Sequence, residues 1–399
     1  MLPDALRFLL LATLAVPPAA LRAPGGPPPA ATAGGAHTQA AETAHRDARQ
    51  TSEEPEEATE GTKATHESER SKTPAAVKAT PNPAAIEANE TPSTGGAPVA
   101  EPDFSAWLEA FVAEARAAGI SERTLAALRR VRPLPRVIEL DRRQPEGTMR
   151  FGRYLRHILG GDRVTYGRRL LAEERETLEA VARTYGVPPR FIVALWGIES
   201  SYGRNTGGFP VLGALATLAW EGRRARFFRG ELLEALRILD EGHVTPEKMT
   251  GSWAGAMGQC QFMPSSFRAW AVDHDGDGRR DIWETRADVF ASTANYLVKN
   301  GWRTGQTWGR RVELPEGFDP KLVGLEIQKP LSEWQALGVR RPGGAPLPSA
   351  EMEGSLVQPG GPRGPTYLVY SNYRVFLHWN RSLYFATAVG LLADRLAAP

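Results

Sequence analysis

The sequence predicts a mainly α-helical protein of the α+β class, in which a large helical region carries small mixed segments. Apolar residues recur with the 3.6-residue period of a helix through most of the chain after residue 103. Runs typical of strands are few. The composition, 42% hydrophobic and 24% charged over 399 residues, leaves room for a large core.

The first helix is expected to begin at Phe104, because Phe104, Trp107 and Leu108 keep the helical period, and to stop at Gly119. Further helices are expected over 122–130, 148–159, 163–185, 188–201, 211–219, 224–241, 264–272, 286–300 and 375–396. Three short runs, 312–314, 323–327 and 366–370, are expected to form a small sheet. The Pro/Gly-rich stretch 341–365 is expected to form long loops.

Residues 1–23 have the layout of a secretory signal peptide: Arg7, then the apolar run 8–16, then small residues and prolines. The run is shorter than a comfortable membrane span. Because Cys260 is the one cysteine of the sequence, no lipid-attachment cysteine lies near the leader and no internal disulfide forms. An exported protein is therefore expected, either soluble or peripheral to a membrane.

Residues 24–102 are rich in Ala, Pro, Gly, Thr and Glu and contain almost no large apolar side chains. Such a segment cannot bury enough surface to offset the entropy of ordering, so a disordered tether is expected. Its net charge is −6, while residues 103–399 carry +7. A basic domain on an acidic tether favours an anionic partner, such as a cell wall, an anionic membrane surface or nucleic acid.

A single glutamate stands out on one predicted helix. From Pro188-Pro189, a favoured helix start, the apolar residues Ile192, Leu195 and Trp196 form one face, and Glu199 continues that face. A carboxyl buried without a partner keeps its proton near neutral pH, as a glycosidase general acid requires. The alternative is a structural glutamate bonded to backbone amides or to an arginine, and this segment alone leaves both open.

The acidic run 273–284 matches a calcium-binding loop, D-x-D-x-D-G followed by an acid at position twelve. The expected ligands are the carboxylates of three aspartates, a backbone carbonyl, an aspartate acting through water and a closing glutamate: Asp273, Asp275, Asp277, Arg279, Asp281 and Glu284. Asp288 is a competing closing ligand if the loop is longer. The alternative is an Asp/Gly turn that binds nothing. A structural ion is favoured over a calcium sensor.

The segment 251–266 combines small residues with neutral hydrogen-bonding side chains, which suits a sugar-binding cleft. Ser252 and Gln261 are candidate donors, and Trp253 offers a stacking face. Tight helix packing would explain the small residues equally well. Cys260 is interpreted as a buried bystander. The histidines after residue 103 are not spaced as zinc ligands or as part of a serine triad.

Several long motifs in this order resemble the lytic murein transglycosylase B family, glycoside hydrolase family 103. They are Glu199 to Gly203, the segment 214–219 with the pairs 223–224 and 227–228, GSWAGAMGQCQFMPSSF, the acidic loop, and the pairs around 295–297 and 301–302. The resemblance covers residues 103–399. It implies a lysozyme-like helical catalytic domain that cleaves the β-1,4 bond between N-acetylmuramic acid and N-acetylglucosamine.

The resemblance also implies a mechanism and a site. Family members are similar to lysozymes but lack a second catalytic carboxylate, so Glu199 would act first as acid and then as base, giving 1,6-anhydromuramic acid without consuming water. By position in the motifs, the saccharide groove would be lined by Ser252, Gln261, Asn380 and Tyr296, with Arg223 and Arg224 meeting the stem-peptide carboxylates. The family's metal loop closes beyond position twelve, which favours Asp288 over Glu284.

Two departures from the family pattern are Trp379, where a tyrosine is common, and the missing lipid-attachment cysteine. The second predicts a soluble periplasmic protein, or one peripheral to the outer membrane. The expected partners are peptidoglycan strands and stem peptides, with cell-wall synthesis or division proteins as further candidates, no nucleic acid and a monomeric state. No cofactor is expected for the chemistry, and calcium or sodium is expected in the loop. The rival interpretations are a non-catalytic peptidoglycan-binding module, a hydrolytic muramidase and a calcium-dependent interaction protein.

Overall fold

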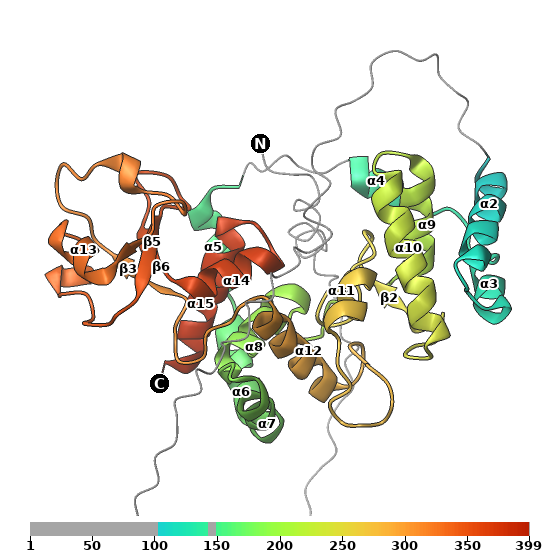
Figure 1. The fold of residues 1–399 in the computed structure, drawn as a ribbon, viewed down its shortest axis with the longest axis horizontal. Helices are drawn as coiled ribbons and strands as arrows, with labels where there is room; N and C mark the ends of the chain where they lie inside the picture. Colours follow the sequence, from blue (N-terminus) through green and yellow to red (C-terminus); the bar gives the residue numbers. More distant parts are fainter. Residues whose placement is uncertain (1–102, 143–148, 399) are drawn as a thin grey trace, which may run out of the picture. The chain divides into compact units, whose positions relative to one another are not determined.

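The computed structural model describes residues 103–142 and 149–398 (Figure 1). The predicted signal peptide, residues 1–23, and the predicted tether, residues 24–102, lie outside the described residues. The described chain is mainly helical with a small antiparallel sheet, so the predicted fold class is confirmed. None of its helices is long and apolar enough to cross a membrane.

The helices follow the predicted order. Their bounds are α2 (Phe104–Ala117), α3 (Glu122–Leu128), α4 (Pro135–Arg142), α5 (Phe151–Leu159), α6 (Arg163–Glu173), α7 (Arg175–Tyr185), α8 (Pro189–Ser200), α9 (Val211–Glu221), α10 (Ala225–Asp240), α11 (Pro264–Trp270), α12 (Arg286–Lys299), α13 (Leu331–Ala336), α14 (Ser371–Trp379) and α15 (Leu383–Ala397). Short 3₁₀ turns occupy Pro320–Leu322 and Pro342–Gly344.

Two predicted helices are each two helices in the structure. The segment 163–185 is interrupted at Glu174, which ends α6 and precedes α7. The segment 375–396 is interrupted at Asn380, whose backbone is extended with φ −148°. Each break falls at a polar residue, which signals the end of a helix less strongly than Gly or Pro does. Because the hydrophobic period continues across each break, the sequence predicted one helix where the structure has two. The helices α4 and α13 were not predicted.

Helix α8 lies in the middle of the main core. Every residue from Phe191 to Ser200 is buried, and α8 packs against α6, α7, α12 and α15. Pro189 begins it, and Ser201 ends it in the left-handed conformation with φ 51°. Gly197 is required for close packing, because a Cβ there would lie 2.5 Å from the ring of Tyr202.

The small sheet has a separate core. Its strands are β3 (Gly309–Val312), β4 (Lys329–Pro330), β5 (Glu353–Val357) and β6 (Thr366–Val369), in the antiparallel order β3-β6-β5-β4. Figure 1 labels three of them, β3, β5 and β6. Trp334 of α13 is fully buried in this core beside Leu331 and Leu356.

Three of the predicted assignments around the sheet need correction. Strand β5 lies inside 341–365, which was predicted to be loops; the surrounding Pro and Gly residues concealed a run whose residues 354–357 are all buried. The predicted strand 323–327 is not part of the sheet; Val323 forms one isolated parallel bridge to Leu356. The predicted 312–314 strand begins earlier, as β3.

Candidate active site

Glu199 occupies the last turn of α8, and its carboxyl is almost entirely removed from water, with 3% of the residue exposed. The indole Nε1–H of Trp379 donates a hydrogen bond of 2.8 Å to its Oε1. Burial raises the pKa of Glu199 to about 8, and the Trp379 hydrogen bond works against that rise. Glu199 is therefore a protonated acid at neutral pH, held by a neutral donor rather than by an arginine.

An aromatic cluster holds Trp379 in place. The ring of Tyr296, from α12, lies 4.6 Å from that of Trp379, and the ring of Phe262 lies 5.4 Å away, measured between centroids. Trp270 packs edge-on against Tyr296 at 4.5 Å. The structure thus brings Tyr296 and Trp379 together beside Glu199, although they are far apart in the sequence.

The loop that carries Ser252 and Gln261 is folded tightly on itself. Its strand β2 (Thr250–Gly251) pairs with β1 (Phe209–Pro210), and the Ser252 hydroxyl accepts a hydrogen bond from the Ala256 amide. Gln261 has a positive φ of 51°, and its side-chain amide donates to the carbonyls of Thr206 and Gly258. Both side chains are buried and fixed by local hydrogen bonds, as preorganised binding groups need to be.

Gln259, to which the sequence assigned no role, joins three parts of the molecule. Its Oε1 accepts from the indole N–H of Trp196 on α8, and its Nε2 donates to the carbonyl of Trp283 at the end of the acidic loop, both at 2.8 Å. Its backbone N–H also donates to the carbonyl of Ile282. The acidic loop is thereby attached to the helix that carries Glu199.

Asn380 follows Trp379 and is buried, with 2% exposed. Its Oδ1 accepts from the Ser382 amide, while its Nδ2 has no hydrogen-bond partner among the residues that the structure describes. An unpaired buried donor is costly unless a ligand completes it.

Tyr154 on α5 lies close enough to Glu199 to be affected by its charge. Burial is the larger cause of the raised pKa of Tyr154, and the charge of Glu199 raises that pKa further. Tyr154 could not be singled out from the sequence, because Phe151, Tyr154 and Ile158 have the spacing of an ordinary core face.

Arg223 and Arg224 both bind the buried carboxylate of Asp141 at the end of α4. Arg223 Nε lies 2.9 Å from Asp141 Oδ2, and Arg224 Nη2 lies 3.2 Å from Oδ1. The Arg223 side chain is half exposed, and that of Arg224 is mostly covered. One acid thus holds both guanidinium groups, which leaves Arg223 with the larger exposed surface for an anionic ligand.

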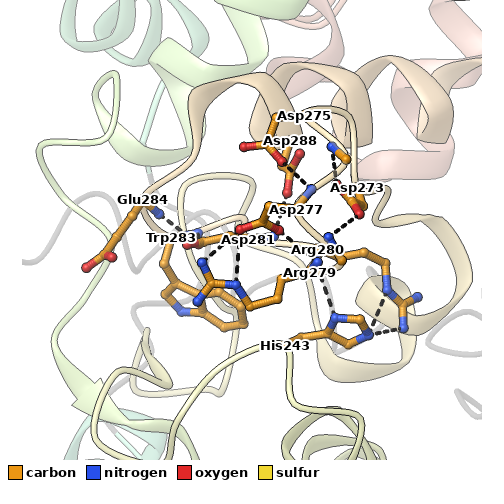
Figure 2. Close-up of polar contacts among 12 residues, drawn as sticks. His243, Asp273, Asp275, Asp277, Arg279, Arg280, Asp281, Trp283, Glu284 and Asp288 are labelled. Carbon is orange, nitrogen blue, oxygen red and sulfur yellow. Dashed lines mark hydrogen bonds and ion pairs between the residues drawn. The ribbon is translucent and has the colours of Figure 1, made fainter.

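The acidic loop gathers three of the predicted metal ligands (Figure 2). Carboxylate oxygens of Asp273, Asp275 and Asp288 all lie within 4.8 Å of one another. Asp288 accepts from the amides of His274 and Asp281, each at 2.7 Å. It is fully buried in the first turn of α12. Burial raises the pKa of Asp288, and the neighbouring charge of Asp275 adds to the rise.

The other predicted ligands have protein partners. Asp277 pairs with Arg279 at 2.8 Å, and Asp281 Oδ1 accepts from the amides of Trp283 and Glu284. Glu284 points away from the three-aspartate cluster (Figure 2) and pairs with Lys248 at 2.8 Å, its side chain 63% exposed. Within the loop, Arg280 Nε donates a hydrogen bond to His243 Nε2. The position-twelve acid therefore lies outside the cluster, and Asp288 lies inside it.

Comparison with known proteins agrees with this architecture. The family profile described as "Transglycosylase SLT domain" matches residues 103–394. A crystal structure of SltB3 from Pseudomonas aeruginosa in complex with NAG-anhNAM-pentapeptide is 48% identical, with a TM-score of 0.73, covering 74% of this chain and 80% of that one. A structure of Slt35 from Escherichia coli in complex with calcium is 30% identical, with a TM-score of 0.62, covering 76% of this chain and 95% of that one.

Membrane-bound lytic murein transglycosylase B of Escherichia coli strain K12 is 37% identical over 202 residues, 47% of this chain. The match spans 56% of the length of that curated relative. The fold, with Glu199 buried at the end of α8, is that of a lysozyme-like helical domain. The chain belongs to the Transglycosylase SLT domain family, and the resemblance predicted from its motifs is confirmed.

Proposed function

We propose that the protein is a peptidoglycan lytic transglycosylase that cleaves the MurNAc-β-1,4-GlcNAc bond and leaves 1,6-anhydro-MurNAc ends, with Glu199 as its catalytic residue. The observation that carries the proposal is the buried carboxyl of Glu199, whose pKa is raised by burial to about 8 and whose hydrogen-bond donor, Trp379, is neutral. SltB3, at 48% identity, has been crystallised with a NAG-anhNAM-pentapeptide, a ligand that contains the anhydro sugar.

Two proton transfers complete the reaction. Glu199 first gives its proton to the glycosidic oxygen while the bond from that oxygen to C1 of MurNAc breaks, and the N-acetyl group of the sugar stabilises the positive charge at C1. The Glu199 carboxylate then takes the proton of the C6 hydroxyl, whose oxygen bonds to C1. A pKa of about 8 suits both steps, because the group begins protonated and its conjugate base is strong.

The surroundings of Glu199 favour this route over hydrolysis. A retaining hydrolase places a second carboxyl about 5 Å from the first. The other buried acids in the described residues are Asp141, Glu231 and Asp288. All three are engaged elsewhere, since Asp141 binds two arginines, Glu231 accepts from Ser265, and Asp288 belongs to the cluster with Asp273 and Asp275.

Groups from several elements would hold the substrate. The unpaired Nδ2 of Asn380 is suited to donate to a sugar oxygen or an N-acetyl carbonyl. Ser252, Gln261 and Tyr296 supply further polar and aromatic surface, and Arg223 and Arg224 would meet stem-peptide carboxylates. The substrate class is thus a glycan strand with its peptides.

The proposed location is the periplasm, after export by a signal peptide in residues 1–23. The name of the Escherichia coli relative describes that protein as membrane-bound. Peptidoglycan as the proposed substrate supports this location.

Product analysis tests the function. Mass spectrometry of sacculi digested with the purified protein is expected to find soluble muropeptides with anhydro ends, each lighter by one water than its hydrolysed counterpart. Reducing muramic acid ends would make the protein a muramidase. Binding of sacculi without release of muropeptides would make it a binding module.

The acidic loop is proposed to hold a structural calcium ion. The residues fit such an ion, because three carboxylates converge and calcium prefers oxygen ligands. The ion would also relieve the repulsion between the buried Asp288 and Asp275. Slt35, at 30% identity, has been crystallised with calcium. Asp273, Asp275 and Asp288 would hold the ion, with Asp277, the Arg279 carbonyl and Asp281 as outer candidates.

Calcium is expected to raise the melting temperature by about 5 °C at a concentration hundredfold above its Kd. Asp288→Asn is expected to abolish this rise, because it removes the buried ligand charge. Glu284→Gln is the matched control and should keep the full rise, since Glu284 lies outside the cluster. Differential scanning calorimetry with calcium and with a chelator measures both. Loss of the calcium response in Glu284→Gln alone would assign the closing ligand to Glu284 instead.

A further inference from the structure

The hydrogen bond from Trp379 distinguishes the two oxygens of Glu199. An indole N–H donates and has no acceptor atom. Oε1 of Glu199 must therefore accept from Trp379 whether the carboxyl is protonated or ionised. Among the residues that the structure describes, hydrogen bonding to Glu199 is confined to Oε1. The exchangeable proton is consequently left to Oε2.

We propose that Trp379 is a positioning residue that restricts the proton of Glu199 to Oε2, so that one and the same oxygen gives the proton to the leaving group and later takes it from the C6 hydroxyl. The inference rests on the proposed function. A carboxyl that serves twice gains from this restriction, because a proton on Oε1 would be directed at the indole instead of at the substrate.

Packing fixes the direction of the indole. Trp379 is the last residue of α14, where the amide of Asn380 still donates to the carbonyl of Phe376 at 2.9 Å. Tyr296 and Phe262 pack against the Trp379 ring. The ring is only partly covered, so it borders the site as well as supporting it.

A tyrosine in this position would act differently. Its hydroxyl both donates and accepts, so it could bond to either protonation state of either oxygen and would leave the proton free to occupy Oε1 or Oε2. Phenylalanine would keep much of the ring packing but offer no donor. Trp379→Tyr and Trp379→Phe therefore separate donation from packing.

Burial shifts the pKa values of three other titratable groups, Tyr154, Cys260 and His378, away from pH 8. Burial raises the pKa of Tyr154 on α5, and it raises that of Cys260 to about 12. Burial lowers the pKa of His378, next to Trp379, below its usual 6.5. Four charged groups on the helices packed against α8 have partners of their own: Arg163, Arg286, Asp394 and Arg395. An alkaline limb of activity near pH 8 therefore reports Glu199.

The proposal is tested by measuring the activity on uncrosslinked peptidoglycan strands as a function of pH. Removing a donor that stabilises the carboxylate raises the pKa of Glu199, so Trp379→Phe should move the alkaline limb of kcat/KM upward by roughly one pH unit. It should also lower kcat about tenfold with little change in KM, since the proton is no longer restricted to Oε2. Trp379→Tyr keeps a hydrogen-bond donor, so its alkaline limb should lie close to that of the wild-type protein. Trp270→Phe removes a neighbouring indole of the same cluster and should leave the limb in place.

Infrared spectroscopy gives a readout that does not depend on turnover. The carboxyl C=O band of protonated Glu199, identified by its absence from Glu199→Gln, is expected at a higher wavenumber in Trp379→Phe, because the C=O loses its donor. An unmoved band and an unmoved limb in a folded Trp379→Phe protein would overturn the proposal and leave Trp379 with packing alone. In that case loss of turnover in Glu199→Gln would still support the proposed function. An active Glu199→Gln protein would contradict both the proposed function and the role of Trp379.

Discussion

Replacing Glu199 with glutamine is expected to lower the release of soluble muropeptides from sacculi by about a thousandfold or more. General acid–base catalysis typically contributes factors of about 10² to 10⁴. Glu199 is proposed to supply both the acid and the base, so both proton transfers lose their partner at once. Glutamine has nearly the same shape, and its Oε1 can still accept from Trp379. The loss of activity therefore reports the loss of the transferable proton and not a change in packing.

Glu231→Gln provides the matched control. Glu231 is also buried on α10, and burial raises its pKa to about 7, yet its oxygens accept from the amide and hydroxyl of Ser265 at the start of α11. Its replacement should leave turnover within a few fold of wild type. Comparable losses in both variants would show that any change to a buried glutamate disturbs the fold, and the assignment of Glu199 would lose its support.

The sequence pointed to Glu199 for a local reason. Its position one turn beyond Trp196 on an apolar helix face predicts burial, and burial of an unpaired carboxyl predicts a raised pKa, as the structure has it. The partner of that carboxyl could not be predicted in this way. Trp379 is 180 residues away, and its approach depends on how α14 packs beside α8 and α12, which no local pattern encodes.

The acidic loop shows the same limit at shorter range. The D-x-D-x-D-G pattern identified the segment, but its spacing alone left Glu284 and Asp288 as rival closing acids. The structure separates them, because α12 begins at Arg286 and buries Asp288 in its first turn, while Glu284 remains on the surface beside Lys248. Strand β5 was missed because burial by Trp334 and Leu331, not alternation in its sequence, makes it part of the sheet.

The stability of the wild-type protein is expected to fall as the pH rises from about 4.5 to about 8, and Glu199 should account for much of the fall. Its pKa is about 8 in the folded protein and near the ordinary 4.5 in the unfolded chain. In this range the folded protein therefore binds more protons than the unfolded chain, and the free energy of unfolding decreases with pH. The contribution is fully present below pH 4.5, is lost by about pH 8, and is on the order of 4 kcal/mol.

Glu199→Gln should remove this dependence, because glutamine has no proton to lose. Urea unfolding at pH 5 and pH 8 is expected to give wild type a much larger difference in the free energy of unfolding than the variant, which should be the more stable protein at pH 8. Glu231→Gln should flatten the profile to a smaller extent, since the pKa of Glu231 rises only to about 7. Equal slopes in wild type and Glu199→Gln would mean that Glu199 ionises normally in the folded protein. The carboxyl would then be a carboxylate at neutral pH, and the proposed first step would lack its proton.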